Sequence, residues 1–224
     1  MIRRIAPYSL RGFLYYQGEE DVQRYADYSD MMQMLVKQWR MDWNDWNLPF
    51  LFVQLPMYLA DGEKDDSYWA LQREQQYIAS MMIQNAGMIS LADCGEYDNI
   101  HPLDKKTPGE RLFQLAKNLV YDKQGTITAT AAQLFSDNGK LYVTFDHLHE
   151  KLVMQTANGC PFEISGEDNL FYPAKADVIH GNMLCISNPA VKFPSAVKYA
   201  WYNFGEAVLF TESGNPVSPF FKCV

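Results

Sequence analysis

The sequence predicts an α/β domain, in which helices cover a parallel sheet, followed by a smaller antiparallel domain of the β-sandwich kind. Two observations lead to this prediction. In the first half, short apolar runs of strand type alternate with segments whose apolar residues recur at helical spacing. From about Gly125 the pattern changes to short β-prone runs separated by turn residues. We therefore divide the chain into residues 1–123 and residues 124–224.

The first domain should contain three strands and three helices in alternation. The strands are apolar runs at residues 12–16, 50–55 and 88–92. The helices are amphipathic segments at residues 21–40, 68–83 and 108–121. For the last helix, Thr107 is the expected N-cap and Pro108 lies in the first turn, where a missing N–H is harmless. This order indicates a parallel sheet layered with helices.

The second domain should consist of antiparallel strands. Its β-prone runs include residues 126–135, 141–145, 152–156 and 197–201. Between the first two of these runs, Asp137-Asn138-Gly139 predicts a tight hairpin turn, because Asn and Gly tolerate a positive φ. His147 and His149 alternate on a strand-like segment, where a solvated strand end explains them better than a metal pair does.

Charge and composition argue against several kinds of partner. The net charge is -8 and Lys and Arg form no cluster, so nucleic-acid binding is not expected and neutral substrates fit better than polyanions. No apolar stretch reaches the roughly 18 residues of a membrane span, and no signal peptide is recognised in the chain. The cysteines form no C-x-x-C pair, which indicates neither a zinc site nor a redox motif and leaves their disulfide state open; they are Cys94, Cys160, Cys185 and Cys223.

A loop with catalytic potential follows the third predicted strand. Residues 94–102 read Cys-Gly-Glu-Tyr-Asp-Asn-Ile-His-Pro and precede the last helix, which places them at the carboxyl edge of the sheet. Open α/β sheets build their sites at this edge. Because Asp98 lies three residues before His101, it can accept the imidazole N–H and leave His101 as a general base toward a serine. The alternative is a solvated turn in which His101 caps the following helix.

Several blocks along nearly the whole chain match one family in order. Residues 98–106 with Gly109-Glu110-Arg111-Leu112 form one block, and Tyr15-Tyr16-Gln17-Gly18-Glu19 forms another, of the W-Y-Q-G-E type. Further matches are Trp39-Arg40 with Leu48-Pro49-Phe50, Val53-Gln54-Leu55-Pro56, Arg73-Glu74-x-Gln76, Phe162-Glu163-Ile164, and residues 171–176, 197–201 and 216–220. Together they resemble the C-terminal portion of the sialate O-acetylesterases, which are SGNH-type carbohydrate O-acetylesterases. The resemblance implies a partial SGNH-hydrolase-like sheet followed by a β-rich accessory domain.

The resemblance also implies an activity, the hydrolysis of acetyl esters on sugars by a serine, histidine and aspartate mechanism without a metal or organic cofactor. It assigns His101 as the general base, Asp98 as its orienting carboxylate and Gln17 as an oxyanion-hole donor. The alternative for Gln17 is a loop amide that is satisfied by backbone groups. Glu19 is a candidate for substrate binding, although it can also only brace its loop. Arg73 is a candidate for binding a sugar carboxylate, with a surface salt bridge as the alternative.

The serine nucleophile itself is not identified in this chain. In the family it lies in a G-x-S-N-like block well upstream of the W-Y-Q-G-E block, whereas only 14 residues precede Tyr15, and no serine of the chain has that context. The pattern Met1-Ile2-x-x-Ile5-Ala6-Pro7-Tyr8 resembles an internal stretch of the family, so Met1 is expected to be an internal methionine of a longer protein. A partial sheet would expose a strand edge, which predicts self-association.

Two other functions stay open at this point. The chain can be a non-catalytic carbohydrate-binding or interaction fragment, in which the second domain retains a binding role. It can also belong to an esterase of acetylxylan type, because the Q-G-E and D-x-x-H blocks do not encode the sugar. The family resemblance implies a periplasmic or secreted location.

Overall fold

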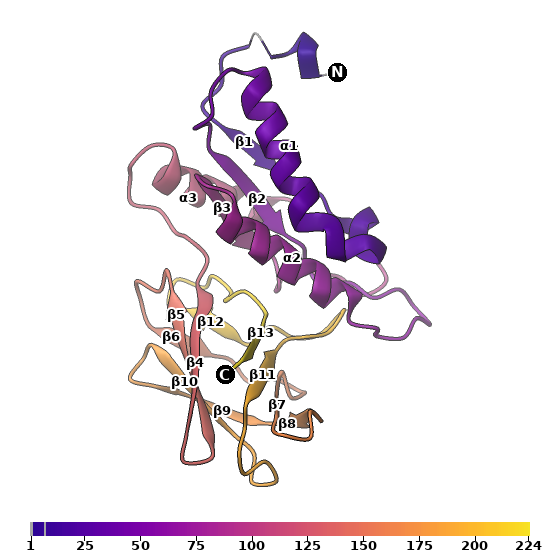
Figure 1. Cartoon of the computed structure of the whole chain (residues 1–224), viewed down its shortest axis with the longest axis vertical. Helices are drawn as coiled ribbons and strands as arrows, with labels where there is room; N and C mark the ends of the chain where they lie inside the picture. Colours follow the sequence, from indigo (N-terminus) through magenta and orange to yellow (C-terminus); the bar gives the residue numbers. More distant parts are fainter. Residues whose placement is uncertain (1, 7) are drawn as a thin grey trace.

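The computed structural model describes residues 2–6 and 8–224. Figure 1 shows a helical region that contains the N-terminal half of the chain and, beneath it, a region built of strands. The expectation that Met1 is internal to a longer protein lies outside the described residues. No helix in the described part of the chain has both the length and the apolar character needed to cross a bilayer.

Three parallel strands form the sheet of the first region, in the order β1 (Phe13–Tyr15), β2 (Phe50–Gln54) and β3 (Ala86–Ser90). This confirms the predicted parallel sheet, although β3 begins two residues earlier than expected. All five residues of the central strand β2 are buried, as a strand covered on both faces requires.

Successive side chains of β2 point to opposite faces of the sheet, and each face has its own helices. Phe50 and Phe52 pack with α1 (Tyr28–Asp42) and α2 (Tyr68–Met82). Leu51 and Val53 pack with Leu112 and Leu115 of α3 (Lys106–Leu119) on the other face (Figure 1). The alternation of the strand therefore builds a three-layer arrangement of helices, sheet and helix.

The start of α1 differs from the prediction. The segment that precedes α1 is a 3-10 helix, η2 (Glu19–Asp27), interrupted by the non-helical backbone of Arg24 at φ -124° and ψ 28°. The predicted helix at residues 21–40 is therefore α-helical only from Tyr28. A short 3-10 turn, η1 (Ile2–Arg4), lies near the N-terminus.

The start of α3 is capped by a residue other than the one predicted. The Oδ1 atom of Asp104 accepts hydrogen bonds from the N–H groups of Lys106, at 3.0 Å, and Thr107, at 3.1 Å. Thr107 lies within the helix, so its expected role as N-cap is wrong. Pro108 occupies the first turn as predicted. The carboxylate of Asp104, just before the helix, also interacts favourably with the positive end of the helix dipole.

The second region is entirely antiparallel, as predicted. One sheet has the order β4-β5-β10-β9 and a second has the order β13-β11-β7-β8, while β12 pairs with β6. The strands are β4 (Thr130–Asp137), β5 (Lys140–Asp146), β6 (Leu152–Met154), β7 (Phe162–Ser165), β8 (Tyr172–Pro173), β9 (Lys175–Ile179), β10 (Met183–Ser187), β11 (Ala196–Tyr199), β12 (Leu209–Thr211) and β13 (Phe220–Cys223).

One apolar core joins the two larger sheets of this region. It includes Val143 and Leu184 from the first sheet and Ile164 and Val197 from the second, and each of these four side chains is fully buried. Such a shared core is the defining property of a β-sandwich. The predicted hairpin connects β4 and β5, with φ at 47° for Asn138 and 73° for Gly139. His147 and His149 lie after β5 and outside any strand, which corrects their expected alternation on one.

Buried polar contacts attach the β region to α2 and to the loops around it. Asn203 is only 4% exposed, and its amide donates to Asp66 Oδ1 at 2.9 Å and accepts from the Trp69 N–H at 3.0 Å. The Gln54 amide, at the end of β2, donates to Ser218 Oγ at 2.8 Å. Because these bonds satisfy the buried side chains of Asn203, Gln54 and Ser218, they fix how the two regions pack.

Candidate functional site

Two loops meet at the carboxyl edge of the parallel sheet. Tyr16, directly after β1, and Ile100, in the loop after β3, pack against the same small apolar cluster of Val22, Leu55 and Trp69. The ammonium of Lys105 lies 5.7 Å from the centre of the Tyr16 ring. The structure therefore brings together the two segments in which the sequence places Gln17 and His101.

The loop that contains His101 is closed by its own polar groups. Glu96 accepts a hydrogen bond from the Asn99 amide and another from the Leu103 N–H, both at 2.6 Å. The Asn99 amide oxygen in turn accepts from the His101 N–H at 3.1 Å. These bonds, first that from the Leu103 N–H, lower the pKa of Glu96 below its usual value. Sequence reasoning gave no role to Glu96 or Asn99, because a short turn network has no signature comparable to that of D-x-x-H.

Asp98 anchors this loop to the loop after β2. Its backbone has a φ of 56°, its N–H donates to the Leu59 carbonyl at 2.9 Å, and its Oδ1 atom accepts from the Asp61 N–H at 2.9 Å. The Tyr97 hydroxyl adds a bond to Asp61 Oδ1 at 3.0 Å. Within the described residues no hydrogen bond joins Asp98 to His101, and the His101 side chain is exposed.

Gln17 lies in a half-buried position with most of its polar groups engaged. Its Nε2 atom donates to Asp21 Oδ2 at 2.6 Å, and its Oε1 atom accepts from the Tyr15 hydroxyl at 3.1 Å. An amide nitrogen has two N–H groups, so one remains for another acceptor. Glu19 is half-buried at the start of η2, and none of the described side chains forms a hydrogen bond with its carboxylate.

A side chain of α2 fixes the position of Gln17. The fully buried Gln76 accepts from the Leu55 N–H at 2.8 Å and donates to the Gln17 carbonyl at 3.3 Å. Gly18 has a φ of 145°, and a Cβ atom there would lie 3.0 Å from Gln76 Nε2 and 3.1 Å from Gln72 Nε2. Only glycine suits this backbone and this space, which explains the Gly of the Q-G-E block.

Arg73 lies in the interior and not at the surface. It is 1% exposed, and its Nη2 atom donates to the Tyr202 carbonyl of the β region. Its Nε and Nη1 atoms have no hydrogen-bond partner among the described residues. Burial lowers the pKa of Arg73 to about 10, although Tyr202 and Asp65 oppose the shift. The alternative of a surface salt bridge is therefore wrong for Arg73, whose guanidinium is buried and forms no ion pair with the described residues.

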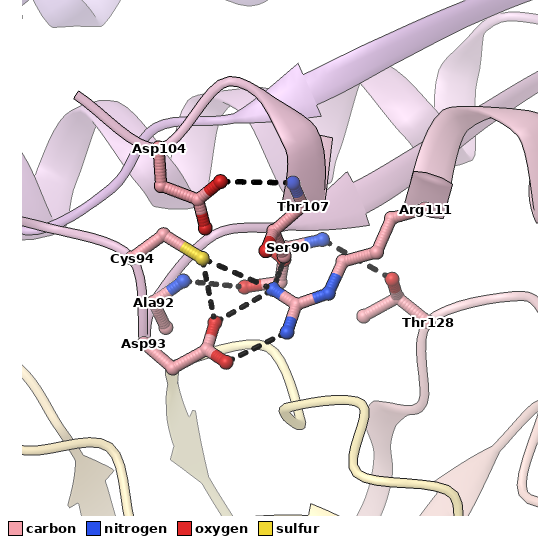
Figure 2. A network of polar contacts seen from close by, with 8 residues as sticks. All are labelled: Ser90, Ala92, Asp93, Cys94, Asp104, Thr107, Arg111 and Thr128. Carbon is pink, nitrogen blue, oxygen red and sulfur yellow. Dashed lines mark hydrogen bonds and ion pairs between the residues drawn. The ribbon is translucent and has the colours of Figure 1, made fainter. Parts of the chain in front are cut away.

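A second network lies just before the His101 loop (Figure 2). Arg111 of α3 forms two hydrogen bonds of 2.6 Å with the two carboxylate oxygens of Asp93 and one of 2.9 Å with the Ser90 carbonyl. Burial, with a smaller contribution from Asp93, raises the pKa of the neighbouring Cys94 thiol to about 12. Cys94 is thus protonated at neutral pH, which is the poorly nucleophilic form of a thiol. All four cysteines are free.

The family is decided by comparison with known proteins. A model of the family described as "Carbohydrate esterase, sialic acid-specific acetylesterase" matches residues 1–119, which is more than half of the chain. The chain belongs to this family. The match includes both loops of the candidate site, so the resemblance seen in the Q-G-E and D-x-x-H blocks is confirmed.

Similar proteins agree with this family. The sialate O-acetylesterase of Mus musculus is 27% identical over 98% of this chain and 46% of its own length. The sialate O-acetylesterase of Homo sapiens is 25% identical over 74% of this chain and 35% of its own length. A crystal structure of a carbohydrate acetylesterase from Xanthomonas citri superposes with a TM-score of 0.89 at 32% identity, covering 97% of this chain and 51% of that one. The chain thus spans about half the length, or less, of the relatives that it matches.

Proposed function

We propose that this chain supplies the histidine, the aspartate and an oxyanion-hole donor of a carbohydrate O-acetylesterase of sialate type, which uses a serine located outside this chain. The observation that supports the proposal best is the meeting of the Gln17 and His101 loops at the carboxyl edge of a parallel sheet. This is where such sheets place reacting groups.

In the proposed reaction His101 acts as the base. Its exposed imidazole takes the proton of the serine hydroxyl while the serine oxygen attacks the acetyl carbonyl. The proton then passes to the sugar oxygen as the bond between that oxygen and the acetyl carbon breaks. Water repeats the same steps on the acetyl-serine and releases acetate.

Asp98 is proposed to orient the imidazole. Its Oδ1 atom is bound to the Asp61 N–H, which fixes the carboxylate, and no partner of its Oδ2 atom is found in the described chain. Rotation of the exposed His101 side chain would allow the ring N–H to donate to this second oxygen. The bond from the Asp61 N–H therefore holds the Asp98 carboxylate in position. Its second oxygen remains able to select the tautomer of His101.

Gln17 and Glu19 are proposed to contact the substrate. The free N–H of Gln17 would donate to the carbonyl oxygen as it becomes negative, an interaction worth about 3–4 kcal/mol in other enzymes. Glu19, at the start of η2 and without a side-chain partner among the described residues, would accept from sugar hydroxyls. Arg73 is too buried for the substrate role considered for it, and we assign it to the contact between α2 and the β region.

The substrate is therefore proposed to be an acetylated sugar, with no metal or organic cofactor, no nucleic acid and no membrane involved. We further propose a periplasmic or secreted location and a boundary between two domains at residues 123 and 124. Limited proteolysis that cleaves between α3 and β4 tests the boundary.

Two forms of the protein test the catalytic assignment. The chain of 224 residues should neither react with a fluorophosphonate probe nor hydrolyse p-nitrophenyl acetate in a His101-dependent way. In a chain extended upstream to a serine block, His101→Ala should lower kcat by about 10³-fold or more with little change in KM. His180→Ala, which alters an exposed histidine of the β region, is the control. An extended, active enzyme that is unaffected by His101→Ala would contradict the proposal.

A further inference from the structure

A polar groove separates α3 from two loops of the β region. One hollow, of about 580 Å³, is lined by Gln114 and Lys117 of α3, by residues 124–127 of the connection to β4, and by residues of the loop after β5 and of the end of β12 with the loop that follows it. A second hollow, of about 630 Å³, extends along α3 to Thr107. The two share Gln114, Thr126 and Ser213, so they form one groove. Each volume lies within the range of about 300–1,000 Å³ that is usual for ligand sites.

We propose that this groove, hereafter the α3 groove, binds a neutral oligosaccharide. Its lining is rich in amide, hydroxyl and imidazole groups, which both donate and accept hydrogen bonds, as sugar hydroxyls do. These groups belong to Gln114, Gln124, Thr126, His147, His149, Thr211, Ser213 and Asn215. The inference concerns binding and does not depend on ester hydrolysis by the chain.

An exposed aromatic ring lies in the same groove. Phe113 lines the second hollow and is 60% exposed, although a phenylalanine on this amphipathic helix would be expected to face the sheet. The ammonium of Lys117 lies 5.9 Å from the centre of its ring. A flat apolar surface beside hydrogen-bonding groups matches a pyranose, which has an apolar face and a rim of hydroxyls.

The charged side chains that line the α3 groove balance, with Arg111 and Lys117 against Glu110 and Glu150, and this balance favours a neutral ligand over an acidic one. Arg111 is bound to Asp93 through two bonds of 2.6 Å, and Lys117 donates to Gln114 Oε1 at 3.2 Å. Glu150 accepts from the Ser213 N–H at 3.0 Å and from its hydroxyl. No unpaired guanidinium is left to neutralise a sugar carboxylate or a phosphate in this groove.

A metal site does not explain the groove. His147, His149 and Glu150 are close in sequence, yet no group of three or more His, Cys, Asp or Glu side chains in the described residues is arranged to hold a metal ion. Glu150 is instead committed to its neighbours. Burial favours its neutral form, but bonds from Ser213 and Thr211 outweigh this and lower its pKa, so it stays ionised and holds the Ser213 loop in place.

The α3 groove is separate from the candidate acetyl-ester site, but one end approaches it. The opposite face of α3 packs against the sheet through Leu112 and Leu115. At its first turn the groove reaches Thr107 and Arg111, which are bonded to Asp104 and Asp93, on either side of the His101 loop. A glycan chain in the groove would therefore run toward that loop.

The test measures binding to the intact chain of 224 residues with four probes. These are xylohexaose, cellohexaose and chitohexaose, which are neutral, and 3′-sialyllactose, which is acidic. Heteronuclear NMR titration should show that at least one hexasaccharide shifts the amide signals of Gln114, Thr126 and Ser213. Phe113→Ala should weaken this binding by about tenfold, the upper range for loss of one aromatic contact.

A matched variant distinguishes an effect specific to the groove from the effect of removing any exposed aromatic ring. Phe193→Ala removes a phenylalanine that is 74% exposed and lies after β10, and it should leave the affinity unchanged. Both variants should unfold at the temperature of the parent chain, because each ring faces water. The proposal is overturned if no hexasaccharide binds, if the shifts map elsewhere, if Phe113→Ala has no effect, or if only 3′-sialyllactose binds in the groove.

Discussion

Arg111 and Asp93 form a paired contact in which two N–H groups of the guanidinium each donate to one carboxylate oxygen at 2.6 Å. The contact joins α3 to the segment between β3 and the His101 loop (Figure 2). Burial alone would lower the pKa of Arg111, but Asp93 raises it above its usual value, so the pair remains charged. The two side chains are 12% and 23% exposed, which limits screening by solvent.

Replacement of Arg111 by leucine should destabilise the chain. The variant leaves the Asp93 carboxylate partly buried without its partner, and we expect a loss of about 1–3 kcal/mol in the free energy of unfolding. Urea denaturation followed by circular dichroism measures it. Lys175→Met, which removes an ion pair whose side chains are 77% and 57% exposed, is the control and should cost less than about 1 kcal/mol. Equal losses for the two variants would contradict the structural role of Arg111.

Gly95 should not tolerate a side chain. A Cβ atom there would lie 2.0 Å from the Met57 carbonyl oxygen, and the clashing atoms belong to the backbone. Gly95→Ala should therefore displace the His101 loop and lower stability by about 1–3 kcal/mol. Gly109→Ala is the control, because no atom lies within 4 Å of its added methyl group and the position is helical. Gly109→Ala should raise stability by roughly 0.5–1 kcal/mol. Thermal unfolding measures the stability of the two variants, and the NMR signals of His101 should shift only in Gly95→Ala.

The closed form of the His101 loop should persist into mildly acidic solution. The bonds from the Leu103 N–H and Asn99 lower the pKa of Glu96 in the folded state. A carboxylate with a lowered pKa contributes stability that is fully present above its unfolded value of about 4.3 and is lost as the pH falls through the lower folded value. NMR signals of the Asn99 side chain and the Leu103 amide should therefore move only below that ordinary value. Glu96→Gln should abolish this titration, and a midpoint at or above 4.3 would be the contrary result.

The sequence predicted the parts of this fold that depend on local pattern. Buried runs such as residues 50–55 and helical spacing such as residues 68–83 reflect the periodicities of strand and helix, and both elements were found. The Asn138-Gly139 turn was predicted because its backbone needs a positive φ. The start of α1 was misjudged because the break at Arg24 does not disturb the apolar spacing on which the prediction relied.

The candidate site was predictable only as far as its motifs. D-x-x-H located the loop, but the partner of Asp98 is the Asp61 N–H, 37 positions away in sequence. Gln76 was noted as part of a family block. Its hydrogen bond to the Gln17 carbonyl was not predicted, because it forms only when α2 packs beside the segment after β1. Asn203 was missed entirely. Contacts between residues far apart in sequence leave no periodic signal in one chain.

Asn203 should be needed for the attachment of the β region to α2. Its side chain binds Asp66 and the Trp69 N–H, while its backbone N–H donates to Asp65 Oδ2 at 2.8 Å. Asn203→Ala leaves the buried Trp69 N–H unsatisfied and should cost about 1–3 kcal/mol. Hydrogen exchange should show faster exchange at Trp69 but not in β10. Asn182→Ala, in the exposed turn before β10, is the control and should leave stability within about 0.5 kcal/mol.

The free edge of β1 should promote self-association. Among the described strands β1 pairs only with β2, and the outward Leu14 is 62% exposed. An unpaired apolar edge offers backbone N–H and C=O groups to a second chain. Sedimentation velocity should therefore show an average mass that rises with concentration, and Leu14→Lys should weaken the association by about tenfold or more. Leu170→Lys, at a leucine that is 60% exposed in the β region, should not weaken it. Because the two leucines are about equally exposed, equal effects would point to general surface hydrophobicity and against the strand edge.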